Sequence, residues 1–146
     1  MAEHSLHTAQ GGGDTSRGRT LTTVLRATAA LAVLAILWQG ATAGGILMRT
    51  STSLGLHEAG AVAVHVLTGL TAVAAFLLWR AARGPLWPTV LAAVVFALSF
   101  VQASLGHDAT LWAHVPGALL LMLGSAAVFV WALLTRSLSP SSHPRT

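Results

Sequence analysis

The stretch Leu54–His65 reads LGLHEAGAVAVH and places His57, Glu58 and a second histidine at the start of a long apolar segment. Ionisable side chains at membrane depth are energetically costly, so those that occur there are candidates for a functional site. A second stretch, Leu111–Leu120, reads LWAHVPGALL and repeats the order of a histidine, two intervening residues, glycine and alanine before an apolar run. We therefore expect two helices that begin in the same way, face each other and share one ligand.

The composition is that of a membrane protein. Of the 146 residues, 54% are hydrophobic and 8% are charged, and the mean hydropathy is +0.71. A soluble domain carries about 25% charged residues, so this chain has too few charges to cover a soluble surface. The absence of cysteine excludes disulfides, thiolate-ligated metal sites and covalently attached haem. Histidine is therefore the main metal-ligating residue type.

Four apolar segments are long enough to cross a bilayer, which requires about 20 residues per helix. They are residues 24–48, 58–80, 86–105 and 109–134. The connections are short, so consecutive helices are antiparallel neighbours. The sequence predicts an all-α, integral membrane, antiparallel four-helix bundle over residues 23–135. The flanking polar segments, 1–22 and 136–146, are expected to be disordered tails.

The placement of arginine predicts the orientation of the spans. With both termini inside, seven of the eight arginines lie on the cytoplasmic side and Arg49 alone lies outside. Cytoplasmic loops carry an excess of basic residues, so we expect a multi-pass protein of the cell membrane with both termini cytoplasmic. In a soluble protein the same arginines would suggest nucleic-acid binding, which we do not expect here. The histidines at residues 57 and 114 then lie at the outer end of the bundle.

The two halves of the chain resemble each other. The corresponding residues are Gln39 and Gln102, His57 and His114, and Gly60 and Gly117. The first and third spans run outward and the second and fourth run back, so the halves are parallel repeats about an axis along the membrane normal. The two histidines then begin equivalent helices at equivalent depth, and their side chains converge across the axis.

Two neutral imidazoles that face each other across a helix bundle are the usual ligands of a six-coordinate b-type haem. We therefore expect haem b with His57 and His114 as its axial ligands. Gly60 and Gly117 suit this use because a flat macrocycle needs helix surfaces without bulky side chains, although the same glycines also permit close helix packing. Further candidates for contact with the cofactor are Gln39, Gln102 and Trp38.

Three more ionisable residues leave alternatives open. His65 lies about two turns deeper than His57. It is a candidate for a second ligand, for a partner of a haem propionate or a quinone, or for a buried histidine bonded to a carbonyl. Glu58 is a candidate proton relay or a partner that fixes a histidine tautomer, or an acidic residue favoured by the helix dipole. His107, in the turn between the last two spans, is typical of a solvated or lipid-facing residue.

Two other classes of function are compatible with the sequence. A copper or zinc protein would draw on the same histidines, although zinc prefers three or four ligands and no H-x-x-x-H spacing occurs. A structural or accessory membrane subunit would use the histidines for packing. We find no nucleophile–base pair and no phosphate-binding loop, so no catalytic residue is predicted. The expected partners are the lipid bilayer, a quinone or redox protein, and further subunits of a homo- or hetero-oligomer.

The order of these residues is similar to one four-span half of the haem A synthase family, and it also resembles small four-span actinobacterial membrane proteins of unknown function. In the synthase family, paired histidines on the second and fourth spans of a half ligate haem, and His57 and His114 correspond to them. The family has two such halves and a glutamate a few residues before the second-span histidine, whereas here Glu58 follows His57. The resemblance therefore implies haem binding rather than haem hydroxylation.

Overall fold

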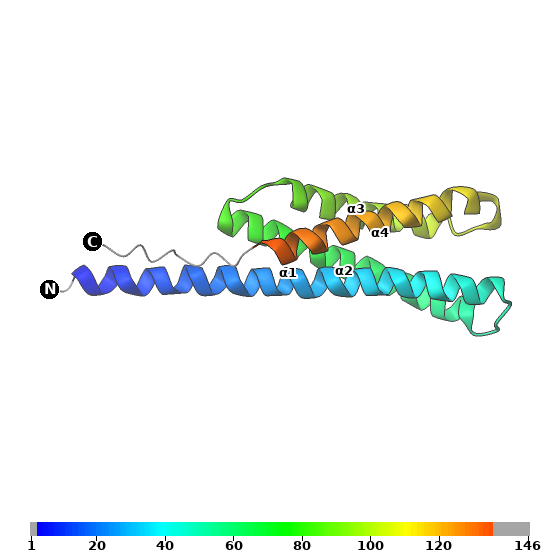
Figure 1. Ribbon diagram of the computed structural model, residues 1–146, viewed down its shortest axis with the longest axis horizontal. Coiled ribbons are helices and arrows are strands. Elements are labelled where there is room, and N and C mark those ends of the chain that lie inside the picture. The colour runs from blue at the N-terminus through cyan, green and yellow to red at the C-terminus, as the bar shows by residue number, and fades with distance from the viewer. Residues whose placement is uncertain (1–2, 136–146) are drawn as a thin grey trace.

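The computed structural model contains four long helices in one antiparallel bundle (Figure 1). It describes residues 3–135, with side-chain surroundings for residues 16–107 and 109–135. The helices are α1 (Glu3–Leu47), α2 (Ser53–Ala82), α3 (Trp87–Ser104) and α4 (Leu111–Leu134), and one 3-10 turn, η1 (Asp108–Thr110), precedes α4. No strand occurs in this part of the chain, which confirms the predicted all-α fold.

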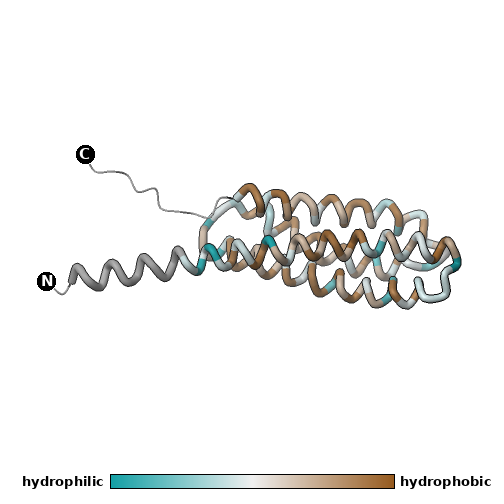
Figure 2. The backbone as a smooth tube through the Cα atoms, turned by 60° about the horizontal axis from the view of Figure 1, so that its bottom comes forward, coloured by the Kyte–Doolittle hydropathy of each residue, from teal (hydrophilic) through white to brown (hydrophobic). Residues whose placement is uncertain are grey.

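All four helices are long and apolar enough to span a membrane. Large apolar side chains face outward on every helix and are more than half exposed, for example Leu34, Val62, Val94 and Leu123. The apolar colouring runs along the length of the bundle (Figure 2). A surface of this kind is stable against lipid and not against water. The protein is therefore a multi-pass integral membrane protein.

The helices are arranged so that α2 packs against both α1 and α3, and α4 also packs against both. The helices α2 and α4 therefore lie diagonally opposite each other. The α1–α2 and α3–α4 connections share one end of the bundle, which we call the histidine end because His57 and His114 lie next to it (Figure 1). The α2–α3 turn lies at the other end, which we call the arginine end because Arg80 and Arg83 lie there.

Two helix starts differ from the predicted boundaries. The helix α1 begins at Glu3 instead of near residue 24, so most of the segment predicted as a disordered tail is helical. Apolar residues mark where a span lies but not where its helix starts, and no proline interrupts the chain before Pro85. The helix α2 begins at Ser53, before the predicted start at residue 58. The predicted tail 136–146 lies outside the described residues.

The buried positions repeat between the two halves. Buried residues of α2 and of α4 that stand 57 positions apart are Val64 and Leu121, Thr68 and Ser125, Thr71 and Val128, and Ala75 and Ala132. Buried residues of α1 and of α3 that stand 63 positions apart are Leu25 and Pro88, Ala29 and Ala92, Ala32 and Val95, and Ile36 and Ser99. The offsets differ because α1 continues to Leu47, well beyond Gln39, whereas α3 ends at Ser104, two residues after Gln102. Equivalent positions therefore face one pseudo-twofold axis, as the repeat predicts.

A hydrogen bond between neighbouring helices follows the same symmetry. On α1, Arg26 donates from Nε to the carbonyl oxygen of Ala132 at 2.8 Å. On α3, Thr89 stands 63 positions later and donates from Oγ1 to the carbonyl oxygen of Ala75, the equivalent of Ala132, at 3.1 Å. The donors are different residue types, but each joins a span of one half to a span of the other.

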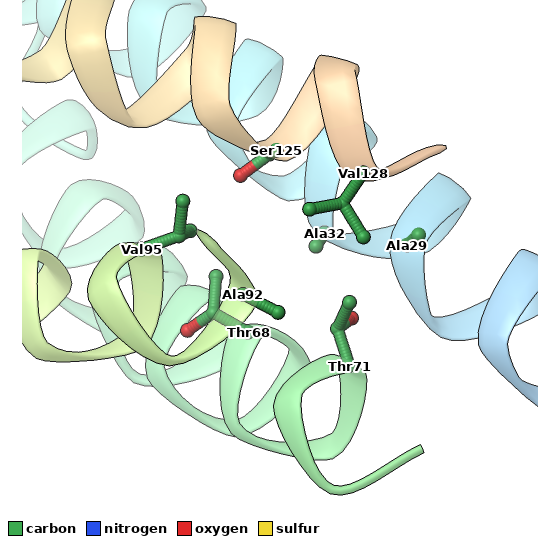
Figure 3. Close-up of a pocket in the computed structure, with 8 residues that line it drawn as sticks. All are labelled: Ala29, Ala32, Thr68, Thr71, Ala92, Val95, Ser125 and Val128. Atoms are coloured by element: carbon green, nitrogen blue, oxygen red, sulfur yellow. The ribbon is translucent and has the colours of Figure 1, made fainter. Parts of the chain in front are cut away.

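A small cavity of about 10 Å³ lies near the middle of the bundle (Figure 3). Its lining consists of four pairs of equivalent residues: Ala29 and Ala92, Ala32 and Val95, Thr68 and Ser125, and Thr71 and Val128. The pseudo-twofold axis therefore passes through it. This volume is close to the minimum for one water molecule, so the cavity is not a cofactor site, and it does not include the paired histidines.

Candidate functional site: the paired histidines

The histidines of the sequence repeat come together at one end of the bundle. His57 lies in the second turn of α2 and His114 in the first turn of α4. Both side chains are half-buried. They project from diagonally opposed helices. The structure therefore places the two predicted ligands at the same end of the bundle.

The ring of His114 is held by the end of the neighbouring helix. Its Nδ1 lies 2.9 Å from the carbonyl oxygen of Gln102. Since α3 ends at Ser104, this carbonyl lacks the usual helical N–H donor four residues on; it accepts from the N–H of Leu105 at 3.2 Å, and its second lone pair is available to His114. A carbonyl only accepts hydrogen bonds, so the neutral ring carries its proton on Nδ1 and has a lone pair on Nε2.

The ring of His57 is held in the same tautomer by a side chain. Its Nδ1 lies 2.9 Å from Oγ1 of Thr42. That hydroxyl lies 3.1 Å from the carbonyl oxygens of both Trp38 and Gln39 and donates to them. A hydroxyl has a single proton; when Thr42 donates it to one of these carbonyls, Oγ1 accepts from Nδ1 and the lone pair of His57 is on Nε2. Neither Nε2 atom has a partner among the described residues, and neither is enclosed by the protein.

Each glycine of the repeat packs against the glutamine of the same half. A Cβ atom on Gly60 would lie 3.0 Å from Oε1 of Gln39 and 3.0 Å from Cδ1 of Trp38. A Cβ atom on Gly117 would collide with the side-chain amide of Gln102, whose Cδ would be 2.9 Å away. The space that the sequence analysis assigned to a macrocycle is therefore taken by glutamine side chains in this conformation.

The amide of Gln102 has an unusual environment. The side chain is 6% exposed, and its Oε1 is buried without a hydrogen-bond partner. A buried acceptor without a donor costs about 1–3 kcal/mol. Among the described residues of the site, this atom is thus the fully buried acceptor that lacks a hydrogen-bond donor.

The remaining predicted ionisable residues are not hydrogen-bonded to either ring of the pair. Glu58 is exposed and is not the residue that fixes either histidine tautomer, because Thr42 and the Gln102 carbonyl do so. His107 is exposed. His65 contacts α3 in the middle of the bundle through Ser99, and its partner is a hydroxyl and not the carbonyl considered in the sequence analysis.

Sequence reasoning missed Thr42. The sequence gives a weak indication of its role, because Thr42 stands three residues after Gln39 and therefore lies on the same face of α1 as that glutamine. The partner of His114 had no signal of this kind, since any residue type at position 102 supplies a carbonyl.

The site is a pair of imidazoles and not a larger cluster. Among residues 16–107 and 109–135, no three histidine, aspartate or glutamate side chains lie close enough to hold a metal ion together. No family model, curated protein or solved structure matches the chain. The interpretation of the site therefore depends on its own geometry.

Proposed function

We propose that this integral membrane protein binds one b-type haem between His57 and His114 and serves in electron transfer, redox sensing or haem handling. The observation that carries the proposal is the matched state of the two rings. They lie on diagonally opposed helices at equivalent positions, each has Nδ1 hydrogen-bonded, and each has an unpartnered Nε2. Histidine ligands of metals usually have this arrangement, in which the bond from the second nitrogen sets the tautomer and the ring orientation.

The residues around the pair fit a flat group under one condition. The side chains of Gln39 and Gln102 must leave Gly60 and Gly117, which then offer helix surfaces without side chains. When Gln102 moves away, its Oε1 is no longer buried without a hydrogen-bond donor. The movement therefore removes the free-energy cost of an unpaired buried acceptor. When bound, a haem with two imidazole ligands supplies one-electron redox chemistry, and the protein residues hold and orient it.

The orientation belongs to the same proposal. Arg80 and Arg83 lie at the arginine end, and Arg26 reaches the end of α4 there, whereas Arg49 lies at the histidine end. By the positive-inside rule the arginine end is cytoplasmic, so the haem lies near the outer face of the cell membrane. Reporter fusions after Ser53 and after Arg83 test this. A cytoplasmic reporter after Ser53 contradicts it.

The visible spectrum of the protein purified from haem-replete cells tests the haem itself. We expect a Soret band and sharp α and β bands after reduction, the spectrum of low-spin iron with two imidazole ligands. Reconstitution of the purified protein with added haemin serves as the control for loss during purification. A protein that stays colourless and contains copper or zinc overturns the proposal in favour of a metal carrier. A colourless and metal-free protein overturns it in favour of a structural subunit.

A further inference from the structure

A second histidine site lies between α2 and α3, deeper in the bundle than His57. The Nδ1 of His65 lies 2.8 Å from Oγ of Ser99, and that hydroxyl donates to the carbonyl oxygen of Phe96 at 2.7 Å. With the serine proton given to Phe96, Ser99 accepts from Nδ1 and His65 has its lone pair on Nε2. This atom has no partner among the described residues and is not enclosed by the protein. The site thus presents a hydrogen-bond acceptor at the surface of the bundle.

The fold does not require this polar pair. By the two repeat offsets, the equivalents of His65 and Ser99 in the opposite pair of helices are Met122 and Ile36. Ile36 is buried in an apolar cluster, and Met122 packs against that cluster. The same packing is therefore achieved with apolar side chains in the other half. The hydrogen bond between the two side chains joins α2 to α3, as polar residues commonly do between membrane helices, and an ionisable side chain at membrane depth is also a candidate for a functional site.

Aromatic side chains surround the acceptor. The ring of Phe100 is stacked on His65 with centroids 4.4 Å apart and an angle of 4° between the planes. The ring of Phe96 packs edge-on against Phe100, with centroids 5.1 Å apart. Gly69 leaves room for Phe96, because a Cβ atom on Gly69 would lie 3.0 Å from Cε2 of the Phe96 ring. Phe100 is 51% exposed on the side of the bundle that meets lipid. The acceptor therefore lies beside a flat apolar surface that is open to the bilayer.

The depth of the site restricts the donor. His65 lies within about one turn of the middle of α2, which spans Ser53–Ala82. The hydrocarbon core offers no water to satisfy polar groups, so the donor must dissolve in lipid. We propose that His65, Ser99 and Phe100 bind the head group of an isoprenoid hydroquinone. One hydroxyl of the head group donates to Nε2 of His65 and its ring lies against Phe100. This inference deepens the proposed function by naming a lipid-soluble electron carrier as partner, and its redox meaning rests on that function.

Binding of three probes to the full-length protein in nanodiscs tests the inference. The probes are a hydroquinone with a short isoprenoid tail, its dimethyl ether, which lacks the donor, and dioleoylglycerol, a lipid alcohol without an aromatic ring. We expect saturable hydroquinone binding, and the ether should bind about tenfold more weakly, the order of one hydrogen bond. Equal binding of the ether overturns the inference. Competition by dioleoylglycerol at equal concentration overturns it in favour of a lipid hydroxyl.

The protein offers a matched variant in its own repeat. The double substitution His65→Met with Ser99→Ile copies the other half, and it should keep the helical content and thermal stability while hydroquinone binding is lost. His65→Phe, which keeps a ring to stack on Phe100 but has no acceptor, should also lose binding. Phe76→Leu, a lipid-facing change elsewhere on α2, is the control and should bind as the wild type does. Unchanged binding in a folded double variant overturns the inference.

The test separates this inference from the proposed function because binding is measured with and without haem. Hydroquinone binding in a haem-free preparation supports the site even if no Soret band is ever found, in which case only the haem proposal fails. A normal haem spectrum without hydroquinone binding in either preparation overturns this inference alone.

Discussion

The pairs α1–α2 and α3–α4 bury the same positions but hold their histidines by different means. In the first pair the partner of His57 is the hydroxyl of Thr42, and in the second the partner of His114 is the backbone carbonyl of Gln102. The cause is the length of the outward helix. The helix α1 continues to Leu47, so the carbonyls of Trp38 and Gln39 have helical N–H partners and also lie 3.1 Å from the Thr42 hydroxyl, whereas α3 ends two residues after Gln102 and leaves a lone pair of its carbonyl for His114.

A second difference lies in the middle of the membrane. The α2–α3 contact contains the polar pair His65 and Ser99, and the equivalent α4–α1 contact contains Met122 and Ile36. The comparison teaches that the symmetry of the bundle comes from small and apolar buried residues. Polar side chains follow that symmetry at Thr68 and Ser125 and depart from it at His65 and Ser99.

The largest expected effect is on the ligand pair, where both halves should contribute equally. His57→Ala and His114→Ala should each abolish the low-spin haem spectrum, since each removes one of the two imidazoles. His65→Ala should leave the spectrum intact because that ring contacts Ser99 instead of the pair. Absorption and electron paramagnetic resonance spectra of the three variants provide the measurement. Low-spin haem that survives in His57→Ala contradicts the assignment.

The next effect concerns Gly60 and Gly117, against which the side chains of Gln39 and Gln102 pack. Gly117→Leu should destabilise the protein by about 1–3 kcal/mol, the usual cost of overpacking, because its Cβ collides with the buried amide of Gln102. Gly60→Leu should cost less, since its Cβ would lie no closer than 3.0 Å to Gln39 or Trp38. Unfolding in denaturing detergent measures both. Gly55→Leu is a control because no atom lies within 4 Å of a Cβ there. Equal stability of Gly117→Leu and the control would refute the packing.

A smaller effect is expected at Thr42, whose side-chain oxygen is the hydrogen-bond partner of His57. In the second half the corresponding partner of His114 is a backbone carbonyl. Thr42→Val keeps the shape but removes the oxygen that accepts from Nδ1 of His57. Loss of such a partner typically lowers metal affinity about 10–100-fold, so haem should dissociate faster. Thr42→Ser retains the hydroxyl and should behave as the wild type. Haem transfer to apomyoglobin measures the rates, and identical rates in the valine and serine variants speak against the role of Thr42.

The smallest effect compares two equivalent hydroxyls at the central cavity. Thr68 donates to the carbonyl oxygen of Val64 at 2.7 Å, whereas Oγ of Ser125 is buried without a partner. Thr68→Ala should therefore cost about 1 kcal/mol, the net value of a typical hydrogen bond. Ser125→Ala should be neutral or slightly stabilising because it removes an unpaired buried group. Detergent unfolding measures both, and a larger loss for Ser125→Ala would show that its hydroxyl has a partner.

The amino-acid sequence alone determined the class of protein and the symmetry of the bundle. A chain that is 54% hydrophobic with four long apolar segments has to satisfy its backbone in lipid, and helices do so within each segment. Hydrophobic length and arginine placement are local properties, so they can be read without a structure. The spacing from Gln39 to His57 and Gly60 and its recurrence in the second half also predicted which helices are equivalent.

Only the tertiary structure decided what surrounds the histidines. The identity of Thr42 as a partner, the carbonyl of Gln102 and the glutamines packed on the glycines depend on how the helices are rotated and where α3 ends. The start of α1 at Glu3 was likewise invisible, because hydropathy marks a span and not a helix. One comparison needed the sequence and the structure together. The repeat in the sequence makes Met122 and Ile36 the equivalents of His65 and Ser99. The contacts between helices show that the two pairs occupy equivalent places in the bundle. The physical reason is that side-chain hydrogen bonds form across helix pairs, between residues whose separation in sequence carries no information about their separation in space.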